Sequence, residues 1–273
     1  MSSFVRAGAF RIATGLAVTF FGIGGAVLLS GSAGPAAAVS SAPSFNHYLC
    51  YTATAKKGFK IPKGTELVPV TSTAAITPKY GAAKLHCNPV LKIVPGAQYP
   101  IVDQTWHYLC FKITASQASM TLTMDNQFGT AQLVTKDPNI FCVPSWKSLT
   151  GPPGQQPTTP PGADHYTCYP VSYASSSQDY APPSPITLKD EFGSTTGVKV
   201  GAPQELCVPT EKILPTGLSY PVNNPSLYYV CFAVSKTPIK SPVYDENQFG
   251  TGTVTIKKTK WLCLPSSPPG TTS

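Results

Sequence analysis

The chain has 273 residues and a formal net charge of +8, and only 12% of its residues are charged. Its 29 prolines and its scarce charges suit short strands joined by rigid turns, and no stretch shows the periodicity of a long amphipathic helix. Arginine occurs only at Arg6 and Arg11 and no nucleic-acid-binding module is recognisable, so we expect no nucleic-acid partner.

The first part of the chain has the three features of a secretory signal peptide. Met1–Arg11 carries two positive charges and no acid, Ile12–Leu29 is apolar, and small residues follow. Ala36 and Ala38 satisfy the small-x-small rule, so we expect cleavage after Ala38 and a signal peptide over residues 1–38. The alternative is an uncleaved anchor, because the apolar run is close to the ~18-residue minimum of a membrane-spanning helix. We therefore expect a secreted, extracellular protein or one of the cell envelope, without a membrane span once this segment is removed.

One sequence pattern recurs four times in the remaining chain. It opens with an aromatic pair, one variable residue and a cysteine, as in His107–Cys110, and a second cysteine follows later. The cysteines are spaced by 37, 23 and 32 residues in the first quartet and by 39, 24 and 32 in the second, which indicates a tandem duplication. An even number of cysteines in an exported chain indicates disulfides. The eight are Cys50, Cys87, Cys110, Cys142, Cys168, Cys207, Cys231 and Cys263.

A Pro-rich, uncharged segment separates the two quartets. Thr150–Ala163 has the composition of a semi-rigid linker. We expect a first domain at 44–149, a linker at 150–163, a second domain at 164–265 and a flexible tail at 266–273.

Alternation of apolar residues predicts short antiparallel strands. His107, Leu109, Phe111 and Ile113 share one face of such a strand, and Tyr228–Val234 repeats the pattern. The predicted fold class is all-β: two tandem, disulfide-stapled β-sandwich or barrel domains, each an internal duplication of a short β unit.

A four-residue motif predicts a tight turn in three of the four units. It occurs as Asn126–Gly129, as Asn247–Gly250 and, altered, as Asp190–Gly193. Asn or Asp caps such a turn with its side-chain oxygen, glycine supplies the positive φ, and the phenylalanine between them folds over the core. The first unit has Thr71–Ala74 near this place, so we expect a looser turn there and no ligand site built from this motif.

Four cysteines in each domain allow three disulfide connectivities. We favour the pattern in which each unit closes its own loop, which would contribute roughly 3–4 kcal/mol for each loop in the chain-entropy model. This pattern joins Cys50–Cys87, Cys110–Cys142, Cys168–Cys207 and Cys231–Cys263.

The histidines at the start of the units are expected to be packed aromatics. His47, His107 and His165 occupy one register, and Tyr228 takes their place in the last unit. A tyrosine does not replace imidazole as a base or metal ligand near neutral pH. His86 has no acidic neighbour in sequence, and no hydrolase, metalloprotease or P-loop motif occurs.

Paired carboxylates are confined to the second half of the chain. Asp190 with Glu191 and Asp245 with Glu246 lie at or beside the predicted turns, where capping explains them. A hydrolase using these acids and a calcium site shared by them are weaker alternatives, because no calcium-loop motif is present. We expect no catalytic residue, no metal site and no cofactor.

The positive charge is concentrated in one loop of the first half. Lys56, Lys57, Lys60 and Lys63 lie close together there, and Trp146 is the tryptophan without an apolar counterpart in the other units. The loop predicts attraction to an anionic envelope polymer, while a solvated loop without such a role is the competing interpretation. Tyr80 is a further candidate for carbohydrate contact.

The quoted motifs resemble those of a family of exported bacterial domains of unknown function that often occur in tandem. The resemblance rests on Asn126–Gly129, Asn247–Gly250 and Leu206–Lys212 and covers most of residues 44–265. It implies an extracellular β domain and no assigned activity. We therefore expect a secreted or envelope-associated, non-catalytic binding or structural protein. A carbohydrate- or wall-polymer-binding module is the alternative, and a cell-wall polymer or another envelope protein is the expected partner.

Overall fold

The computed structural model describes residues 45–55, 58–154 and 160–271. The expected signal peptide, Lys56, Lys57 and the centre of the expected linker lie outside the described residues. The described part of the chain is all-β, as predicted, and none of it forms a helix that is long and apolar enough to cross a membrane.

Four repeats supply the strands. Repeat one contains β1 (His47–Ala55), β2 (Glu66–Pro69), β3 (Lys79–Val94) and β4 (Ala97–Tyr99). Repeat two contains β5 (His107–Thr114), β6 (Thr121–Asn126), β7 (Gly129–Thr135) and β8 (Ile140–Ser148). Repeat three contains β9 (His165–Tyr173), β10 (Ile186–Asp190), β11 (Gly193–Val198), β12 (Val200–Ile213) and β13 (Ser219–Tyr220). Repeat four contains β14 (Tyr228–Val234), β15 (Pro238–Asn247) and β16 (Gly250–Ser266).

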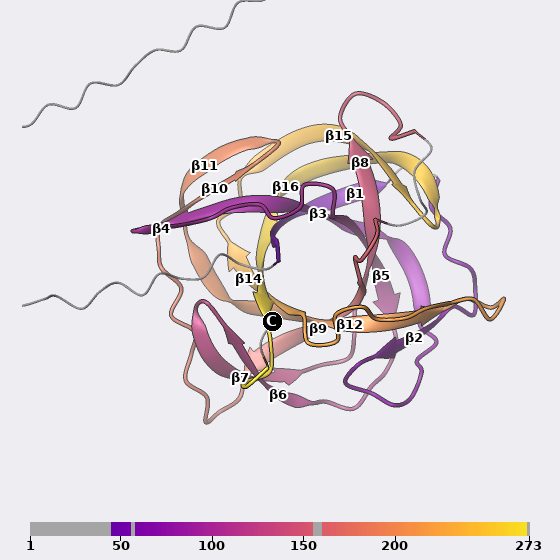
Figure 1. Ribbon diagram of the computed structural model, residues 1–273, viewed down its shortest axis with the longest axis horizontal. Helices are drawn as coiled ribbons and strands as arrows, with labels where there is room; N and C mark the ends of the chain where they lie inside the picture. Colours follow the sequence, from indigo (N-terminus) through magenta and orange to yellow (C-terminus); the bar gives the residue numbers. More distant parts are fainter. Residues whose placement is uncertain (1–44, 56–57, 155–159, 272–273) are drawn as a thin grey trace, which may run out of the picture. The chain divides into compact units, whose positions relative to one another are not determined.

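The first and last long strands of each repeat form a closed ring (Figure 1). Within the repeats, β1 pairs with β3, β5 with β8, β9 with β12 and β14 with β16, all antiparallel. Between the repeats, β3 pairs with β5, β8 with β9 and β12 with β14, and β16 returns to β1. The ring is therefore closed by pairing the last repeat with the first.

Each disulfide joins the two ring strands of one repeat, so the favoured connectivity is confirmed. The bonds are Cys50–Cys87, Cys110–Cys142, Cys168–Cys207 and Cys231–Cys263. In all four strand pairs the two cysteines lie directly opposite each other. Direct opposition in an antiparallel pair brings two Cβ atoms close enough for a disulfide.

Four tyrosines fill the centre of the ring with the disulfides. Tyr48, Tyr108, Tyr166 and Tyr229 each follow the first residue of a ring strand and are buried. Their rings make four consecutive edge-to-face contacts, with centroids 5.1, 5.6, 5.2 and 5.3 Å apart, and the contacts close into a circle. Because these side chains occupy it, the central space of Figure 1 is an apolar core. The predicted alternation is confirmed: Tyr108 and Cys110 belong to this inner core, and Leu109, Phe111 and Ile113 to the outer one.

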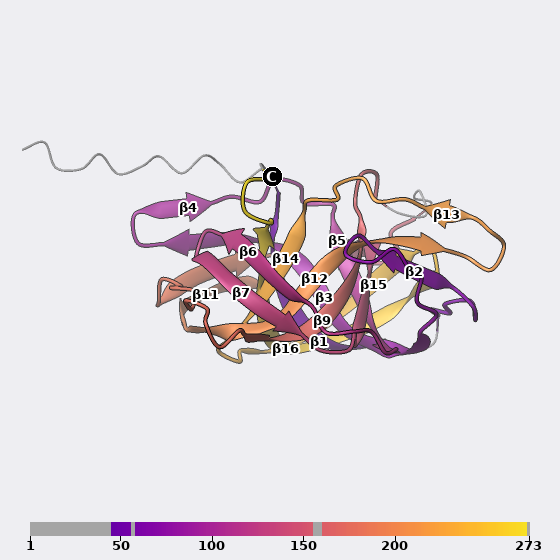
Figure 2. The same cartoon turned by 90° about the horizontal axis from the view of Figure 1, so that it is seen from below.

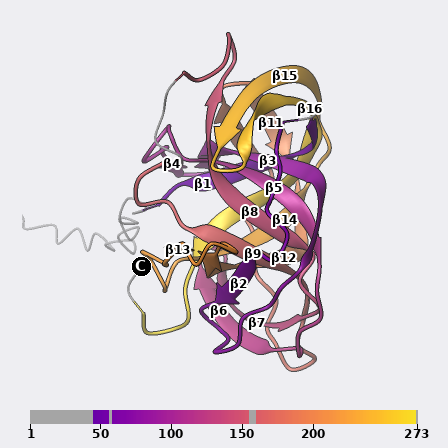
Figure 3. The ribbon, with the colours of Figure 1, turned by 90° about the vertical axis from the view of Figure 1, so that its right-hand side faces the viewer.

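The remaining strands cover the outside of the ring, and each hairpin reaches across to other repeats. β2 pairs with β12, β10 with β3, and β15 with β8, two repeats away in each case. The β6–β7 hairpin follows the same rule, because Asp125 bridges to Ser267 at the end of β16. Figure 3 shows β15 and β16 at one side of the ring and β6 and β7 at the other. Figure 2 shows β4 and β13 at opposite sides of one end of the ring.

The structure differs from the expected division into two domains at 44–149 and 164–265. Strands of both halves share the ring, because Phe141 of β8 pairs with Thr167 of β9 across the expected linker. The described residues belong to one compact unit. The expected flexible tail differs as well: Ser266 and Ser267 are buried, and Ser267 exchanges backbone hydrogen bonds with Asp125.

Candidate binding site

The three predicted turns form tips that close over the outer face of the ring. The side-chain oxygens of Asn126, Asp190 and Asn247 accept the backbone N–H two residues later, at 2.8, 2.9 and 2.9 Å. The glycines that end these turns have φ values of 111°, 127° and 130°. The capping function predicted from the motif is confirmed. We call these turns tip two, tip three and tip four, after their repeats.

The phenylalanine of each tip packs against the ring. Phe128 lies 5.1 Å from Phe232, Phe192 lies 5.4 Å from Tyr51, and Phe249 lies 6.4 Å from Phe111, between ring centroids. Phe128 and Phe249 are buried, and Phe192 is half-buried. The plug predicted from the motif is therefore present in all three tips.

Each tip also brings a Gln or Glu side chain to a buried His–Lys pair of the preceding repeat. Tip two places Gln127 against Lys92 Nζ and His47 Nε2. Tip four places Gln248 against His165 Nε2, which lies 3.3 Å from Lys212 Nζ. Tip three places Glu191 in an ion pair with Lys147, in the repeat of His107. We call these groups the His47 cluster (His47, Lys92, Gln127), the His107 cluster (His107, Lys147, Glu191) and the His165 cluster (His165, Lys212, Gln248).

The lysines of the clusters occupy one place in the repeat, five residues after its second cysteine. The fourth repeat has Pro268 at this place and Tyr228 in place of the histidine, and repeat one supplies no tip. The equivalent group in the fourth repeat therefore lacks all three polar members. The three histidines are buried, as predicted, but the lysines and tips that contact them were not predicted.

Burial alters the protonation of these clusters. It lowers the pKa of Lys92 to about 7 and that of Lys212 to about 6. Burial and the Lys92 charge lower the pKa of His47 to about 3, and burial lowers the pKa of His165 well below its usual value. For Lys147, burial lowers the pKa to about 8, against the attraction of Asp190 and Asp245. The imidazoles are therefore neutral near pH 7.

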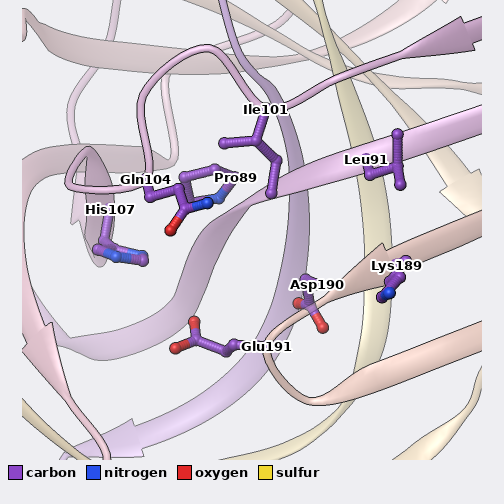
Figure 4. A pocket seen from close by; sticks show the side chains of 8 residues that line it. All are labelled: Pro89, Leu91, Ile101, Gln104, His107, Lys189, Asp190 and Glu191. Atoms are coloured by element: carbon purple, nitrogen blue, oxygen red, sulfur yellow. The ribbon is translucent and has the colours of Figure 1, made fainter. Parts of the chain in front are cut away.

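The His107 cluster adjoins a sizeable cleft (Figure 4). The cleft has a volume of about 290 Å³ and is lined by His107, Gln104, Lys189, Asp190 and Glu191, with Pro89, Leu91 and Ile101 as its apolar part. In Figure 4 these residues surround one space, with Asp190 and Glu191 coming from tip three and the strand before it. Polar groups and an apolar wall around one cavity are typical of a small-molecule site.

The cleft lies at a place where repeat two differs from repeats one and three. Tyr99 of β4 lies 4.2 Å from Lys92 Nζ and 5.5 Å from His47, measured to ring centroids. Tyr220 of β13 covers Lys212 and His165 in the same way, at 3.5 and 5.9 Å. After β8 the described chain forms no strand that corresponds to β4 or β13. The ring contact described for His107 is with His86, at 6.0 Å.

Comparison of the repeats with one another singles out five polar residues near this cleft. His86 stands where the other repeats have Phe141, Leu206 and Leu262, and Asn88 stands where they have Val143, Val208 and Leu264. Two residues before the tip, Asp245 replaces Met124 and Leu188. In tip three, Asp190 and Glu191 replace the amides Asn126, Gln127, Asn247 and Gln248. A polar group that occurs in one copy of a repeated unit is not required by the shape that all copies share.

Four of these residues, Asp190, Asn88, His86 and Asp245, are linked through one chain of contacts that passes through His107. Asp190 Oδ2 accepts the Tyr51 hydroxyl at 2.6 Å and the Asn88 amide at 3.3 Å. Asn88 Oδ1 lies 3.2 Å from His107 Nδ1, and His107 packs against His86. His86 Nε2 lies 2.9 Å from Asp245 Oδ2. A single-copy polar network therefore extends from the cleft into the buried outer face of the ring.

The lysines predicted as binding residues lie elsewhere. Lys60 and Lys63 are exposed, and the loop that carries them is attached to tip four, because Lys60 N donates to Phe249 O at 2.9 Å. Trp146 is half-buried on β8, opposite Glu246 of β15. Tyr80 is half-buried, packs on Phe141 and donates its hydroxyl to Thr65 O.

The acids proposed as a shared calcium site have separate partners. Asp190 accepts hydrogen bonds from Tyr51 and Asn88, Glu191 pairs with Lys147, and Asp245 pairs with His86. Within the described ranges, no group of three or more His, Cys, Asp or Glu residues is arranged to hold a metal ion.

The comparison with known protein families also identifies a repeat in this chain. A family described as a repeat of unknown function (DUF7450) matches residues 106–265, which is more than half of the chain. The chain belongs to the DUF7450 family. The match covers repeats two to four, and repeat one of this DUF7450 chain shares their ring strands and disulfide although it lacks their tip. No curated protein and no solved structure matches the chain.

Proposed function

We propose that the chain is an exported, non-catalytic binding protein of a bacterial cell envelope, which holds a small polar ligand in the cleft beside His107. The observation that carries this proposal is one cleft of about 290 Å³ that is lined by Asp190 and Glu191, which are acids in this repeat only. The buried polar residues Asn88, His86 and Asp245 lie behind this lining and connect to Asp190 and His107. Export is supported by four disulfides, which persist in oxidising compartments, and by the signal-like start of the sequence.

Binding is favoured over catalysis because the polar groups at the cleft already have partners. Asp190 accepts three hydrogen bonds, from Tyr51, Asn88 and the backbone N–H of Phe192. Glu191 is paired with Lys147. Burial lowers the pKa of His107 well below its usual value, so its imidazole is a poor general acid or base near pH 7. Such fixed acceptors suit a ligand that donates hydrogen bonds.

A sugar unit of an envelope polysaccharide fits this chemistry. Its hydroxyls can donate to the carboxylates of Asp190 and Glu191, and its C–H face can pack on Leu91 and Ile101. The test is co-sedimentation of the purified mature chain with isolated cell wall, followed by calorimetry with soluble wall fragments. Leu91→Arg, which fills the cleft, is expected to abolish binding, and Val102→Arg, at an exposed side chain outside the lining, is expected to leave it unchanged.

A second candidate function is supported by the anchored lysine loop. Lys60 and Lys63 project from a segment whose backbone is held by tip four, so their charges have a fixed place on the surface. An anionic wall polymer would bind there with an affinity that falls as salt is added. Binding that is lost in Lys60→Gln/Lys63→Gln and retained in Leu91→Arg would favour this site over the cleft. If the wild-type chain does not bind wall material at all, both candidates fall.

A further inference from the structure

Two of the three clusters place a buried lysine amine beside the side-chain amide of a glutamine. In the His47 cluster, Lys92 Nζ contacts Gln127 Oε1 directly. In the His165 cluster, Lys212 occupies the equivalent place, and Gln248 Oε1 is buried and has no hydrogen-bond partner among the described residues. Both lysine side chains are fully buried. In the His47 cluster the fold therefore holds an amine nucleophile against an amide carbonyl, and in the His165 cluster it brings the amine and the amide to one histidine.

In the His165 cluster, a histidine contacts the nitrogen atoms of both the lysine and the glutamine. His165 Nε2 lies 3.3 Å from Lys212 Nζ and also contacts Gln248 Nε2. His47 Nε2 contacts Gln127 Nε2 in the same way. A neutral imidazole in this position can accept a proton from an attacking amine and pass it to a leaving amide nitrogen.

The surroundings favour the neutral, nucleophilic form of the lysines. Tyr220 and Phe249 flank Lys212 Nζ at 3.5 and 5.1 Å from their ring centroids, and Tyr99 and Phe128 flank Lys92 Nζ at 4.2 and 4.8 Å. Burial among these rings lowers the pKa of Lys92 to about 7, so a large share of this amine is unprotonated near neutral pH. No carboxylate forms a salt bridge with either lysine in the described part of the chain.

We propose that Lys92 with Gln127, and Lys212 with Gln248, form intramolecular isopeptide cross-links. The lone pair of Nζ attacks the side-chain carbonyl carbon of the glutamine, and the histidine transfers one proton from Nζ to the glutamine Nε2. The bond between that carbon and Nε2 then breaks. The products are a secondary amide that joins the two side chains and one molecule of ammonia. The reaction is a transamidation and needs no oxidant, reductant or further reactant.

The His107 cluster serves as an internal control. Its tip carries Glu191, whose carboxylate holds Lys147 as its ion-pair partner and whose side chain is 32% exposed. An ionised carboxylate resists attack by an amine, and an ammonium has no lone pair to attack with. Lys147 and Glu191 therefore remain an ion pair.

The cross-links would complement the disulfides. Each disulfide joins two strands of one repeat, whereas Lys92–Gln127 joins repeats one and two and Lys212–Gln248 joins repeats three and four. They would fix tips two and four to the ring covalently and leave tip three, at the cleft, without such a bond.

The test is the intact mass of the purified mature chain. The sample is first shown to contain no free thiol, so that it is folded, and is then reduced and alkylated in denaturant. The expected mass is lower than the sequence mass by two molecules of ammonia. A tryptic digest is expected to contain branched peptides that join Lys92 to Gln127 and Lys212 to Gln248. An intact mass equal to the sequence mass overturns the proposal.

Variants at the lysines show which side chains take part in the loss of ammonia. Lys92→Met and Lys212→Met are each expected to have a mass that is one molecule of ammonia below the mass of the variant's sequence. The double variant is expected to have the mass of its sequence. Lys147→Met is the matched control, and its mass is expected to stay two molecules of ammonia below the mass of its sequence. A deficit that persists in the Lys92→Met/Lys212→Met variant arises elsewhere in the chain and overturns the proposal.

Discussion

His86 Nε2 lies 2.9 Å from Asp245 Oδ2, and both side chains are completely buried. His86 belongs to the first repeat and Asp245 to the last, so the pair connects the two ends of the series of repeats. Asp245 Oδ1 and His86 Nδ1 have no hydrogen-bond partner among the described residues. Apart from their contact with each other, the two buried side chains therefore have few polar interactions that offset their loss of hydration. The equivalent places in the other repeats hold apolar residues, namely Phe141, Leu206, Leu262, Met124 and Leu188.

Removing one member of this pair is expected to destabilise the protein strongly. Asp245→Leu or His86→Leu alone should lower the free energy of unfolding by about 3–5 kcal/mol, because a buried polar or charged group then loses its partner. Guanidinium denaturation with the disulfides intact measures this loss.

The control is the double variant His86→Leu/Asp245→Leu, which restores the apolar pairing of the other repeats. Well-packed apolar residues often replace a buried ion pair without loss of stability, so the double variant should be close to the wild type. If the two single losses simply add in the double variant, the contact does not couple the two residues.

Local features of this fold were predictable, whereas closure of the ring was not. The pairing of Cys50 with Cys87 was favoured among three possible connectivities, and the turn at Asn126 follows from its capping oxygen and its glycine. These features depend on residues within one repeat. The contact of His86 with Asp245 joins strands of different repeats, through the pairing of β15 with β8 and of β16 with β1, which no local pattern specifies.

The expected division into two domains differs from the structure for a related reason. The Pro-rich composition of residues 150–163 indicates a linker, but a linker between repeats does not reveal whether the flanking strands pair. Here Cys142 and Tyr166 lie opposite each other across it. A signal for the polar network was present in the sequence. Aligning the four repeats shows that His86 and Asn88 have only apolar counterparts, and such single-copy polar residues can be found without a structure.

Glu205 is expected to make the stability depend on pH. It is buried at a place where the other repeats have Leu85, Ile140 and Trp261, and its Oε1 accepts a hydrogen bond from Asn139. Burial raises its pKa from 4.5 to about 7, against the effects of Asn139 and Lys260. Because the folded state binds this proton more tightly than the unfolded state, its contribution is complete below pH 4.5 and is lost as pH rises through 7. The loss should be of the order of 3 kcal/mol.

Glu205→Gln tests this expectation, because glutamine keeps the bond to Asn139 and does not titrate. The variant should be more stable than the wild type at pH 8 and similar to it at pH 4. Urea denaturation at a series of pH values gives both curves. Parallel curves would show that Glu205 is not the group responsible.

The four tyrosines of the ring are expected to resist ionisation. Burial raises the pKa of Tyr108, Tyr166 and Tyr229 well above the usual value, and that of Tyr48 is raised for the same reason. In the unfolded chain tyrosine ionises near pH 10. In carbon-13 NMR of labelled tyrosine, the Cζ signals of these four residues should therefore not shift until alkali unfolds the protein. Tyr108→Phe should remove one of them, and a signal of this set that shifts at pH 10 in the folded protein would contradict the closed packing.

The glycines that end tips three and four separate the effect of backbone conformation from that of close packing. Gly193 and Gly250 have similar φ values of 127° and 130°. A Cβ on Gly193 would meet no atom within 4 Å, whereas a Cβ on Gly250 would collide with the carbonyl oxygen of Gly58. Gly193→Ala should therefore show only the strain of a positive φ, about 1–3 kcal/mol.

Gly250→Ala should lower the stability by about 1–3 kcal/mol more than Gly193→Ala, because the segment at Gly58 must also move. That movement breaks the hydrogen bond from Lys60 N to Phe249 O and should release the lysine loop. Denaturation curves measure the difference in stability, and the rate of tryptic cleavage at Lys60 measures the release. Equal losses of stability in the two variants, with unchanged cleavage at Lys60, would show that the lysine loop is not held by tip four.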